Sequence, residues 1–167
     1  MNAKAQMTPQ TTRHVDVAII GSGFGGLCMA IQLRMAGNDN FVILEKDREV
    51  GGTWRDNHYP GCACDVQSHL YSFSFEGKPD WSKRYAPWNE IQDYILQTTE
   101  KYGIRPFVRF NADVVGAVYD ESSARWTLSM ADGSTLIARF VVMATGPLHV
   151  PAIPDIPGME RFQGRLF

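Results

Sequence analysis

The sequence predicts an α/β fold in which a parallel sheet carries an antiparallel excursion. Two short apolar runs, at 17–20 and 41–44, are separated by a glycine-rich turn and a segment of helical character. A later stretch, 116–140, alternates between apolar and polar residues. Unbroken apolar runs are typical of parallel strands buried on both faces, whereas alternation is typical of antiparallel strands with one face in water. A chain of 167 residues is long enough for one such domain with its own core.

The first apolar run leads directly into a G-x-G-x-x-G motif over 21–26. Gly21 permits a tight turn off the strand, Gly23 lacks the Cβ that would hold a pyrophosphate away from the backbone, and Gly26 lets the next helix pack closely on the strand. That helix is expected over 27–36, and its N-terminus offers free N–H groups and a positive dipole end to phosphate. Strand, glycine loop and helix in this order predict a Rossmann-type dinucleotide site.

The second apolar run ends in Glu45, where dinucleotide-binding folds place an acid. A carboxylate there can accept hydrogen bonds from both hydroxyls of a ribose. It would repel a 2′-phosphate, which favours FAD or NAD over NADP as the ligand. The alternative is a surface acid at the end of a strand. The spacing from the glycine motif favours the ribose role.

The composition is ordinary for a soluble globular protein, with 44% hydrophobic and 20% charged residues. A net charge of −2 gives no reason to expect nucleic acid or an anionic membrane as a partner. No apolar run approaches the length of a transmembrane helix. Residues 1–14 lack the apolar centre of a signal peptide and are expected to be a flexible tail.

Three cysteines, Cys28, Cys62 and Cys64, form an odd set for a disulfide framework. Two cysteines separated by one position seldom pair, so we expect free thiols in a reduced, cytoplasmic compartment. Cys62 and Cys64 have no partner histidines at ligand spacing, and no metal site is expected.

After Glu45 the chain is rich in glycine and aromatic residues and is expected to be mostly loop. A helix is expected over 89–102. Asn89 is the expected N-cap, and Gly103 is the residue at which the helix is expected to end.

The second half of the chain is expected to be mainly strand. The expected strands are 108–115 and, in the antiparallel excursion, 117–119, 125–130 and 135–140. The apolar run 140–143 is expected to be buried on both faces. It ends in Ala144-Thr145-Gly146, small residues where a strand would pass close to a ligand.

These motifs together resemble the class B flavoprotein monooxygenases, and within them most closely the Baeyer–Villiger monooxygenases. The resemblance rests on the glycine motif and Glu45 and on four further stretches: Gly51-Gly52-Thr53-Trp54, Tyr59-Pro60-Gly61, Cys64-Asp65 and Ala144-Thr145-Gly146. The family fingerprint F-x-G-x-x-x-H-x-x-x-W begins at Phe162 and breaks off before its histidine. The chain therefore looks like the front of a longer protein, truncated before the NADPH domain and its catalytic arginine.

The resemblance implies a three-part division of the chain. Residues 1–14 would be the tail, 15–146 the FAD-binding domain, and 147–167 a proline-rich linker with the start of the missing NADPH domain. The parent enzyme would use NADPH to reduce FAD, capture O₂ as a flavin C4a-peroxide and convert a ketone into an ester or lactone. A further domain or chain on the C-terminal side would be its partner.

The resemblance also implies roles for particular residues. Asp65 would be catalytic, lying near the flavin and nicotinamide and orienting a distant arginine. The candidate cofactor-binding residues are Gly21, Gly23, Phe24, Gly26, Glu45, Lys46, Gly52, Thr53, Trp54, Asp56, Ala63, Cys64, Asp65, Tyr71, Val114, Ala144, Thr145 and Gly146. The alternatives are that Trp54 is a core residue, that Asp65 caps the segment after it, and that Gly51-Gly52 is a flexible turn.

Two other functions fit the same sequence. The first is a flavin monooxygenase that oxygenates nitrogen or sulfur rather than a ketone. The second is an isolated FAD-binding fragment without catalytic activity. The start of the fingerprint at Phe162-x-Gly164 favours the Baeyer–Villiger type over the first alternative.

Overall fold

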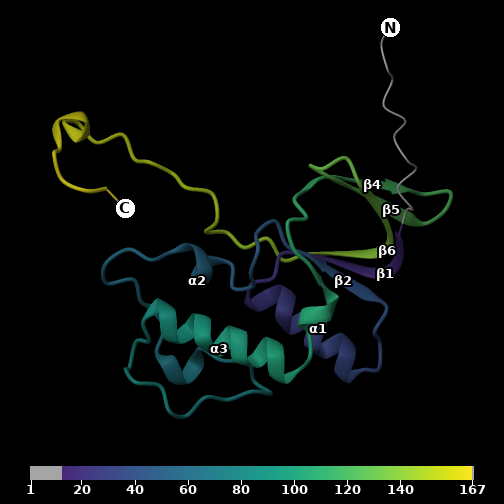
Figure 1. Ribbon diagram of the computed structural model, residues 1–167, viewed down its shortest axis with the longest axis horizontal. Coiled ribbons are helices and arrows are strands. Elements are labelled where there is room, and N and C mark those ends of the chain that lie inside the picture. The colour runs from purple at the N-terminus through teal and green to yellow at the C-terminus, as the bar shows by residue number, and fades with distance from the viewer. Residues whose placement is uncertain (1–12, 167) are drawn as a thin grey trace, which may run out of the picture.

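The computed structural model describes residues 13–166, whose strands form one six-stranded sheet (Figure 1). The strand order is β3-β2-β1-β6-β5-β4. Four strands run parallel: β1 (Arg13–Ile20), β2 (Phe41–Leu44), β3 (Val108–Arg109) and β6 (Thr135–Met143). Antiparallel pairing adds β5 (Arg125–Met130) to β6 and β4 (Val114–Asp120) to β5. The predicted α/β fold with an antiparallel excursion is confirmed.

Two long helices, α1 (Phe24–Met35) and α3 (Trp88–Lys101), lie on the same side of the sheet (Figure 1). The shorter elements are α2 (Thr53–Asp56) and the 3₁₀ turns η1 (Ser68–Leu70), η2 (Arg105–Phe107) and η3 (Met159–Arg161). After Met143 the chain leaves the sheet as an extended, exposed segment. No helix in residues 13–166 is long and apolar enough to cross a membrane.

Two cores lie against opposite faces of the central strands. Because side chains alternate along a strand, Val17 and Ile19 of β1 pack against α1 and α3, while Ala18 points to the other face. On that other face, Ala18 packs with Leu128 of β5 and Leu136 of β6. The antiparallel excursion thus covers the face that the helices leave open.

The structure corrects the expected boundaries in the first third of the chain. β1 begins at Arg13, so the last two residues of the predicted tail 1–14 belong to the sheet, and residues 1–12 lie outside the described part. α1 begins at Phe24, inside the glycine motif rather than after it. The predicted strand at 41–44 matches β2.

The single strand predicted over 108–115 is wrong. Val108–Arg109 forms β3 beside β2, whereas Val114 begins β4 at the opposite edge of the sheet. Between them Asn111 adopts φ +54° and its N–H donates to the carbonyl of Asp47. This turn carries the chain past the end of β2, and pattern alone does not reveal it because both halves are apolar.

The prediction that 140–143 is buried on both faces is also wrong. Phe140 is 57% exposed and Met143 is 68% exposed. β5 pairs with β6 only as far as Ala138, so the last part of β6 has β1 as its single neighbouring strand. Val141 and Val142 are half-buried against the two cores, and the described chain leaves both ends of the run exposed.

The helix predicted over 89–102 is present as α3, although its N-cap is not Asn89. Pro87 is the N-cap, and its carbonyl accepts from the N–H groups of Glu90 and Ile91. The Glu90 carboxylate, in the first turn of α3, accepts hydrogen bonds from the N–H and the hydroxyl of Ser82. These bonds fix the loop that leads into the helix. Gly103, at φ +60°, follows the C-cap as predicted.

The packing of α1 on β1 predicts opposite effects at two adjacent glycines. A Cβ on Gly26 would lie 2.0 Å from the carbonyl oxygen of Gly21, whereas a Cβ on Gly25 would meet only the Ala144 side chain, at 3.9 Å. We expect Gly26→Ala to lower the free energy of unfolding by about 2–4 kcal/mol. Gly25→Ala, the matched control, should raise it by up to about 1 kcal/mol through helix propensity.

Urea unfolding followed by circular dichroism measures both effects. Equal stability of Gly26→Ala and the wild-type chain would show that α1 can move away from β1 without cost.

Candidate functional site

The glycine loop lies where β1, β2 and β6 end. Gly21 donates its N–H to the carbonyl of Leu44 at 2.9 Å, and Ala144 donates to the carbonyl of Ile20 at 2.9 Å. Gly21 has φ +98°, and a Cβ there would lie 2.6 Å from the carbonyl oxygen of Ala144. Glycine is therefore required at position 21, because the end of β6 passes against its backbone.

A second glycine pair meets the loop backbone to backbone. Gly51 donates its N–H to the carbonyl of Ser22 at 3.0 Å. A Cβ on Gly52 would lie 3.3 Å from the Cα of Gly23, and a Cβ on Gly23 would meet only Gly52, at 3.9 Å. The two loops thus touch without intervening side chains, and the N-terminus of α1 stays open for an anion to approach.

Helix α3 packs against the loop that contains Gly51 and Gly52. Gln92 of α3 donates from Nε2 to the carbonyl of Val50 at 2.8 Å. A Cβ on Gly51, whose φ is +131°, would lie 2.1 Å from Gln92 Oε1. That buried oxygen has no hydrogen-bond partner within residues 13–166. Gly51-Gly52 is therefore a tightly packed loop, and the flexible-turn alternative does not describe it.

Glu45 lies at the end of β2 and is 3% exposed. Its Oε2 accepts hydrogen bonds from the N–H and the hydroxyl of Ser22, and its Oε1 accepts from the N–H of Asp47 at 3.0 Å. Arg55 forms an ion pair with Oε1 at 3.1 Å. The alternative of a surface acid is therefore wrong. The carboxylate is tied to the glycine loop through Ser22.

Burial raises the pKa of the Glu45 carboxyl, but the hydrogen bonds from Ser22 and Asp47 and the charge of Arg55 lower it by more. The net pKa lies below the ordinary value of a glutamate. The acid is thus held ionised although it is buried.

An aromatic cluster joins three of the candidate residues. Trp54 donates from Nε1 to the hydroxyl of Tyr71 at 3.0 Å, and the two rings meet edge-on. Phe24, from the glycine motif, contacts Tyr71 with ring centroids 5.1 Å apart. Burial raises the pKa of Tyr71, so its hydroxyl stays protonated. Trp54 is 9% exposed and belongs to the buried core cluster, which agrees with the alternative that it is a core residue.

Burial alternates along the segment around Asp65. Cys64 is buried and donates its N–H to the carbonyl of Ala86, while Ala63 and Asp65 are exposed on either side of it. Burial raises the pKa of the Cys64 thiol, which keeps it protonated. Gln67 rather than Asp65 is the N-cap of η1, so the capping alternative for Asp65 is wrong.

The remaining candidates lie around the strand ends. Asp56 in α2 is paired with Arg55 at 2.8 Å, and Thr53 begins the same helix. Val114 begins β4, two residues after Ala112, whose N–H donates to the carbonyl of Glu45. Thr145 and Gly146, like Lys46, are exposed.

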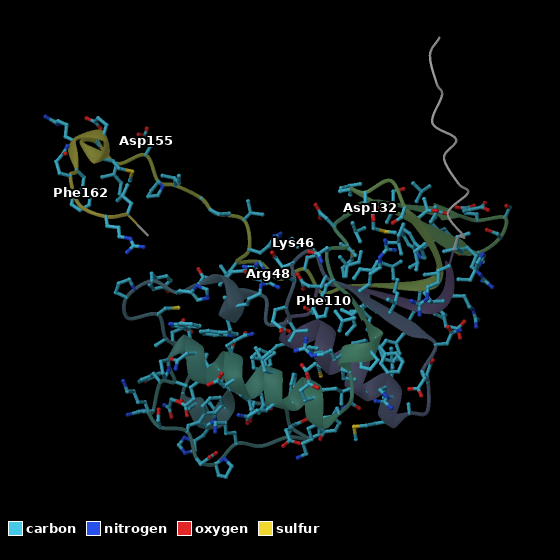
Figure 2. The ribbon with its side chains drawn as sticks, viewed as in Figure 1. Lys46, Arg48, Phe110, Asp132, Asp155 and Phe162 are labelled. Carbon is cyan, nitrogen blue, oxygen red and sulfur yellow. The ribbon has the colours of Figure 1, made fainter. Side chains whose placement is uncertain are left out.

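The structure does not bring the fingerprint residues to this site. Figure 2 shows Asp155 and Phe162 on the extended C-terminal segment, away from the sheet, whereas Lys46 lies at the carboxyl end of β2. Gly164 follows Phe162 on the same exposed segment.

Three residues of the site were missed from the sequence. Ser22 occupies a variable position of the motif, Arg55 follows the Gly51–Trp54 stretch, and Gln92 lies in a distant helix. Only Ser22 could have been found from the sequence, since its position between two motif glycines places it at the end of the strand. Arg55 and Gln92 reach the site through tertiary contacts.

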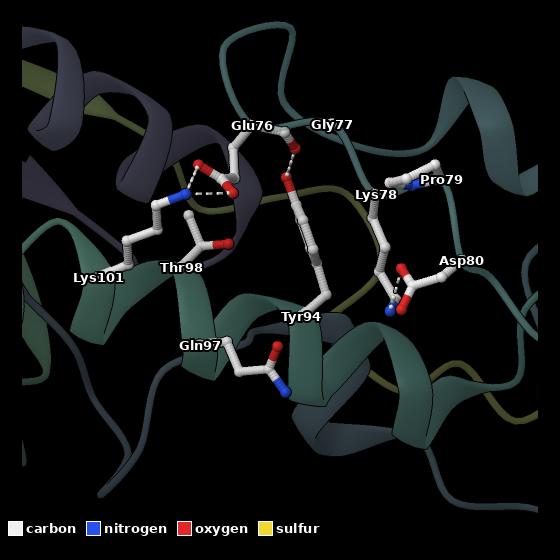
Figure 3. Close-up of a pocket in the computed structure, with 9 residues that line it drawn as sticks. All are labelled: Glu76, Gly77, Lys78, Pro79, Asp80, Tyr94, Gln97, Thr98 and Lys101. Carbon is white, nitrogen blue, oxygen red and sulfur yellow. Dashed lines mark hydrogen bonds and ion pairs between the residues drawn. The ribbon is translucent and has the colours of Figure 1, made fainter.

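A separate pocket of about 220 Å³ lies between α3 and the loop before it (Figure 3). Tyr94 donates there to the carbonyl of Glu76 at 2.7 Å, and Lys101 forms an ion pair with the Glu76 carboxylate at 2.8 Å. None of the candidate cofactor residues lines it. Among residues 13–166 no cluster of three or more His, Cys, Asp or Glu could hold a metal ion.

The chain is similar in sequence to known proteins. Residues 19–87 match the family model of an NAD(P)-binding Rossmann-like domain. A Baeyer–Villiger monooxygenase of Streptomyces coelicolor is 49% identical over 158 residues, which cover 95% of this chain and 30% of the relative. One of Pseudomonas aeruginosa is 49% identical over 162 residues, with 97% and 31% covered.

Solved structures agree. An oxidized steroid monooxygenase bound to NADP superposes with a TM-score of 0.80 at 37% identity, covering 90% of this chain and 30% of that one. Cyclohexanone monooxygenase from Rhodococcus sp. Phi1 bound to NADP⁺ gives 0.82 at 34% identity, with 92% and 30% covered. The resemblance to class B flavoprotein monooxygenases is confirmed, and the chain spans about 30% of the length of the curated relatives it matches.

The environment of Glu45 predicts a pH dependence of stability. Because its pKa is lower in the folded than in the unfolded chain, its contribution is present above the unfolded value of about 4.3 and is lost as the pH falls through the folded value. Glu45→Gln places an amide beside donors and should cost about 2–4 kcal/mol at pH 7.

Urea unfolding of both chains between pH 7 and pH 3 measures this. The difference between them should shrink on acidification. A difference that stays constant down to pH 3 would contradict the ionised state of Glu45.

Proposed function

We propose that this chain is the FAD-binding part of an FAD- and NADPH-dependent monooxygenase of the Baeyer–Villiger type, which converts a ketone and O₂ into an ester or lactone. The observation that carries the proposal is the open glycine loop: Gly23 and Gly52 meet backbone to backbone, and Ser22 ties the loop to Glu45. Relatives that share 49% identity over nearly the whole chain are named Baeyer–Villiger monooxygenases.

The residues present fit FAD. A Cβ at position 23 would stand in the open space before α1, so the glycine leaves room for a pyrophosphate, which the helix N-terminus stabilises. Glu45 would hold the adenosine ribose, and Lys46 and the backbone near Val114 would lie beside the adenine. Bound FAD would supply the redox and oxygen-activating chemistry.

On the flavin side, we assign positioning to the aromatic cluster. Trp54 and Tyr71 form a rigid wall, since their rings meet edge-on and are joined by a hydrogen bond, and Phe24 packs against Tyr71. Thr53 and Asp56 in α2 and Ala144, Thr145 and Gly146 after β6 would border the cofactor. Asp65 is exposed beside the protonated thiol of Cys64, and its carboxylate would orient a distant arginine near the flavin and the nicotinamide.

The substrate and partner assignments belong to the same proposal. Several neighbours of this chain are cyclohexanone monooxygenases, one of them solved with cyclohexanone bound, which favours a small-molecule ketone over a nitrogen or sulfur substrate. A C-terminal partner domain or chain would complete the NADPH site. No nucleic acid is expected as a partner. The free thiols of Cys28, Cys62 and Cys64 favour a cytoplasmic location.

A second function, FAD binding without oxygenation, is favoured by one observation. Phe140 and Met143 are exposed at the end of β6, directly before the Ala144 that touches the glycine loop. The two side chains lie on opposite faces of β6, because Phe140 is opposite Val17 and Met143 is opposite Ile20. Both faces of this strand end thus offer apolar side chains for contact with another domain. The described chain by itself therefore leaves the cofactor side open to water, and excluding water is what monooxygenases need.

Retention of flavin tests the cofactor assignment. After mixing with FAD and desalting, the wild-type chain should keep flavin absorbance. Gly23→Val should abolish it, because a branched side chain would fill the space before α1. Gly77→Val is the matched control, since a Cβ at Gly77 meets nothing within 4 Å and lies outside the site. Equal retention by Gly23→Val and Gly77→Val would overturn the assignment.

An activity assay tests whether this chain oxygenates a ketone on its own. The chain with FAD, NADPH and cyclohexanone should consume NADPH no faster than free FAD does, because water reaches the flavin and the nicotinamide site is incomplete. Gas chromatography for the lactone provides the second readout. Lactone formation at an ordinary enzymatic rate would eliminate the non-catalytic function.

A further inference from the structure

Arg55 has more polar contacts than its place in a four-residue helix would suggest. Its side chain is only 15% exposed. Nε and Nη2 contact the two carboxylate oxygens of Asp56 at 2.8 and 3.1 Å, and Nη2 also contacts Asp47 Oδ2 at 2.9 Å. Nη1 donates to the carbonyl of Glu49 at 2.6 Å and pairs with Glu45 Oε1 at 3.1 Å. All three nitrogens are used.

These contacts join the end of β2, the loop after it and helix α2. The loop residues Asp47 and Glu49 and the acid Glu45 converge on one guanidinium, which can span them because it is planar and forked. Lysine, a point charge on a flexible stem, could pair with one carboxylate but could not hold all of them.

The Glu45 carboxylate is equally well occupied. Three hydrogen bonds and one ion pair match the roughly four lone-pair positions of its two oxygens. Two of the donors are backbone N–H groups and one is Arg55, all fixed in place. The fourth is the hydroxyl of Ser22, a buried side chain whose O–H can turn about its C–O bond.

We propose that Arg55 positions Glu45 for the adenosine ribose of the cofactor, and that a ribose hydroxyl takes the place of the Ser22 hydroxyl on Oε2. The inference rests on the proposed function, since it needs a ribose at this site. It adds a residue to which neither the motif nor the names of the relatives assign a role.

The charges around Glu45 explain why a fixed cation is required. Arg55 contacts the Glu45 carboxylate from α2 through Nη1, and Asp47 and Asp56 contact the other two nitrogens of the guanidinium. Burial alone would favour the protonated acid. A protonated Glu45 would keep one oxygen for its own proton and would accept one ribose hydroxyl fewer. Arg55 thus fixes the direction of the acceptor, and it helps the hydrogen bonds from Ser22 and Asp47 to keep the acceptor ionised.

The experiment compares Arg55→Met and Arg55→Lys with Arg105→Met. Arg105 is a matched control, because it pairs with Glu49 and Glu100 but not with Glu45. Two quantities are measured: the Glu45 pKa by ¹³C NMR in the ligand-free chain, and the Kd of FAD by flavin fluorescence from pH 5.5 to 8. Circular dichroism verifies folding in each case.

The wild-type chain and Arg105→Met should show a low Glu45 pKa and a Kd that is flat over this range. Arg55→Met should raise the Glu45 pKa, and below that pKa its affinity should fall by up to about tenfold for each pH unit. Arg55→Lys should restore part of the low Glu45 pKa and part of the FAD affinity at low pH. The double variant with Glu45→Gln should bind weakly at every pH, because the titrating group is gone.

An unchanged Glu45 pKa and a flat Kd in Arg55→Met would overturn the inference. If Arg55→Met does not fold, Arg55→Lys decides, since full wild-type behaviour of the lysine variant would show that the fork is not needed. If the wild-type chain itself binds no FAD, the proposed function fails. The ribose role of Arg55 then fails with it, while the NMR titration still reports whether Arg55 controls Glu45.

Discussion

The site depends on one steric constraint, which is that no side chain stands between the end of β1 and the start of α1. The Cα of Gly26 lies so close to the carbonyl of Gly21 that an added Cβ would come within 2.0 Å of that oxygen. Gly21 is confined in turn by the carbonyl of Ala144 at the end of β6. This close approach fixes the helix N-terminus over the strand ends. It also places Ser22 where Glu45 can bind its N–H and hydroxyl.

Around the glycine loop, hydrogen bonds and an ion pair hold the segments together, whereas in the cores apolar side-chain packing does so. The Ser22 carbonyl accepts from Gly51, and the Val50 carbonyl accepts from Gln92 of α3. Glu45 and Arg55 connect the same loops from the other side. Because these bonds are buried, each would be expensive to break in isolation. The loops are therefore held as one unit whose shape is set before any ligand arrives, which reduces the entropy that binding has to overcome.

The sequence predicted the parts of this unit whose signals are local. The glycine motif, Glu45 and the helices and strands next to them follow from residue type and spacing alone. Arg55 and Gln92 could not be found this way, since their contacts join segments that no periodicity relates. The division of 108–115 between β3 and β4 depends on the turn at Asn111. The exposure of Phe140 depends on where β5 stops, and an apolar run does not encode the length of its neighbour.

The pairing of β1 with β6 has a consequence for how the chain is made. Val17 is opposite Phe140, and Ile20 is opposite Met143, so the first strand of this sheet waits until a strand more than 100 residues later has been synthesised. Contacts this distant in sequence slow folding, because a long loop must close before they form. Until then β1 has β2 on one side and an open edge on the other, which is a known route to aggregation during synthesis. Nascent chains of this protein should therefore depend on chaperones until β6 has emerged.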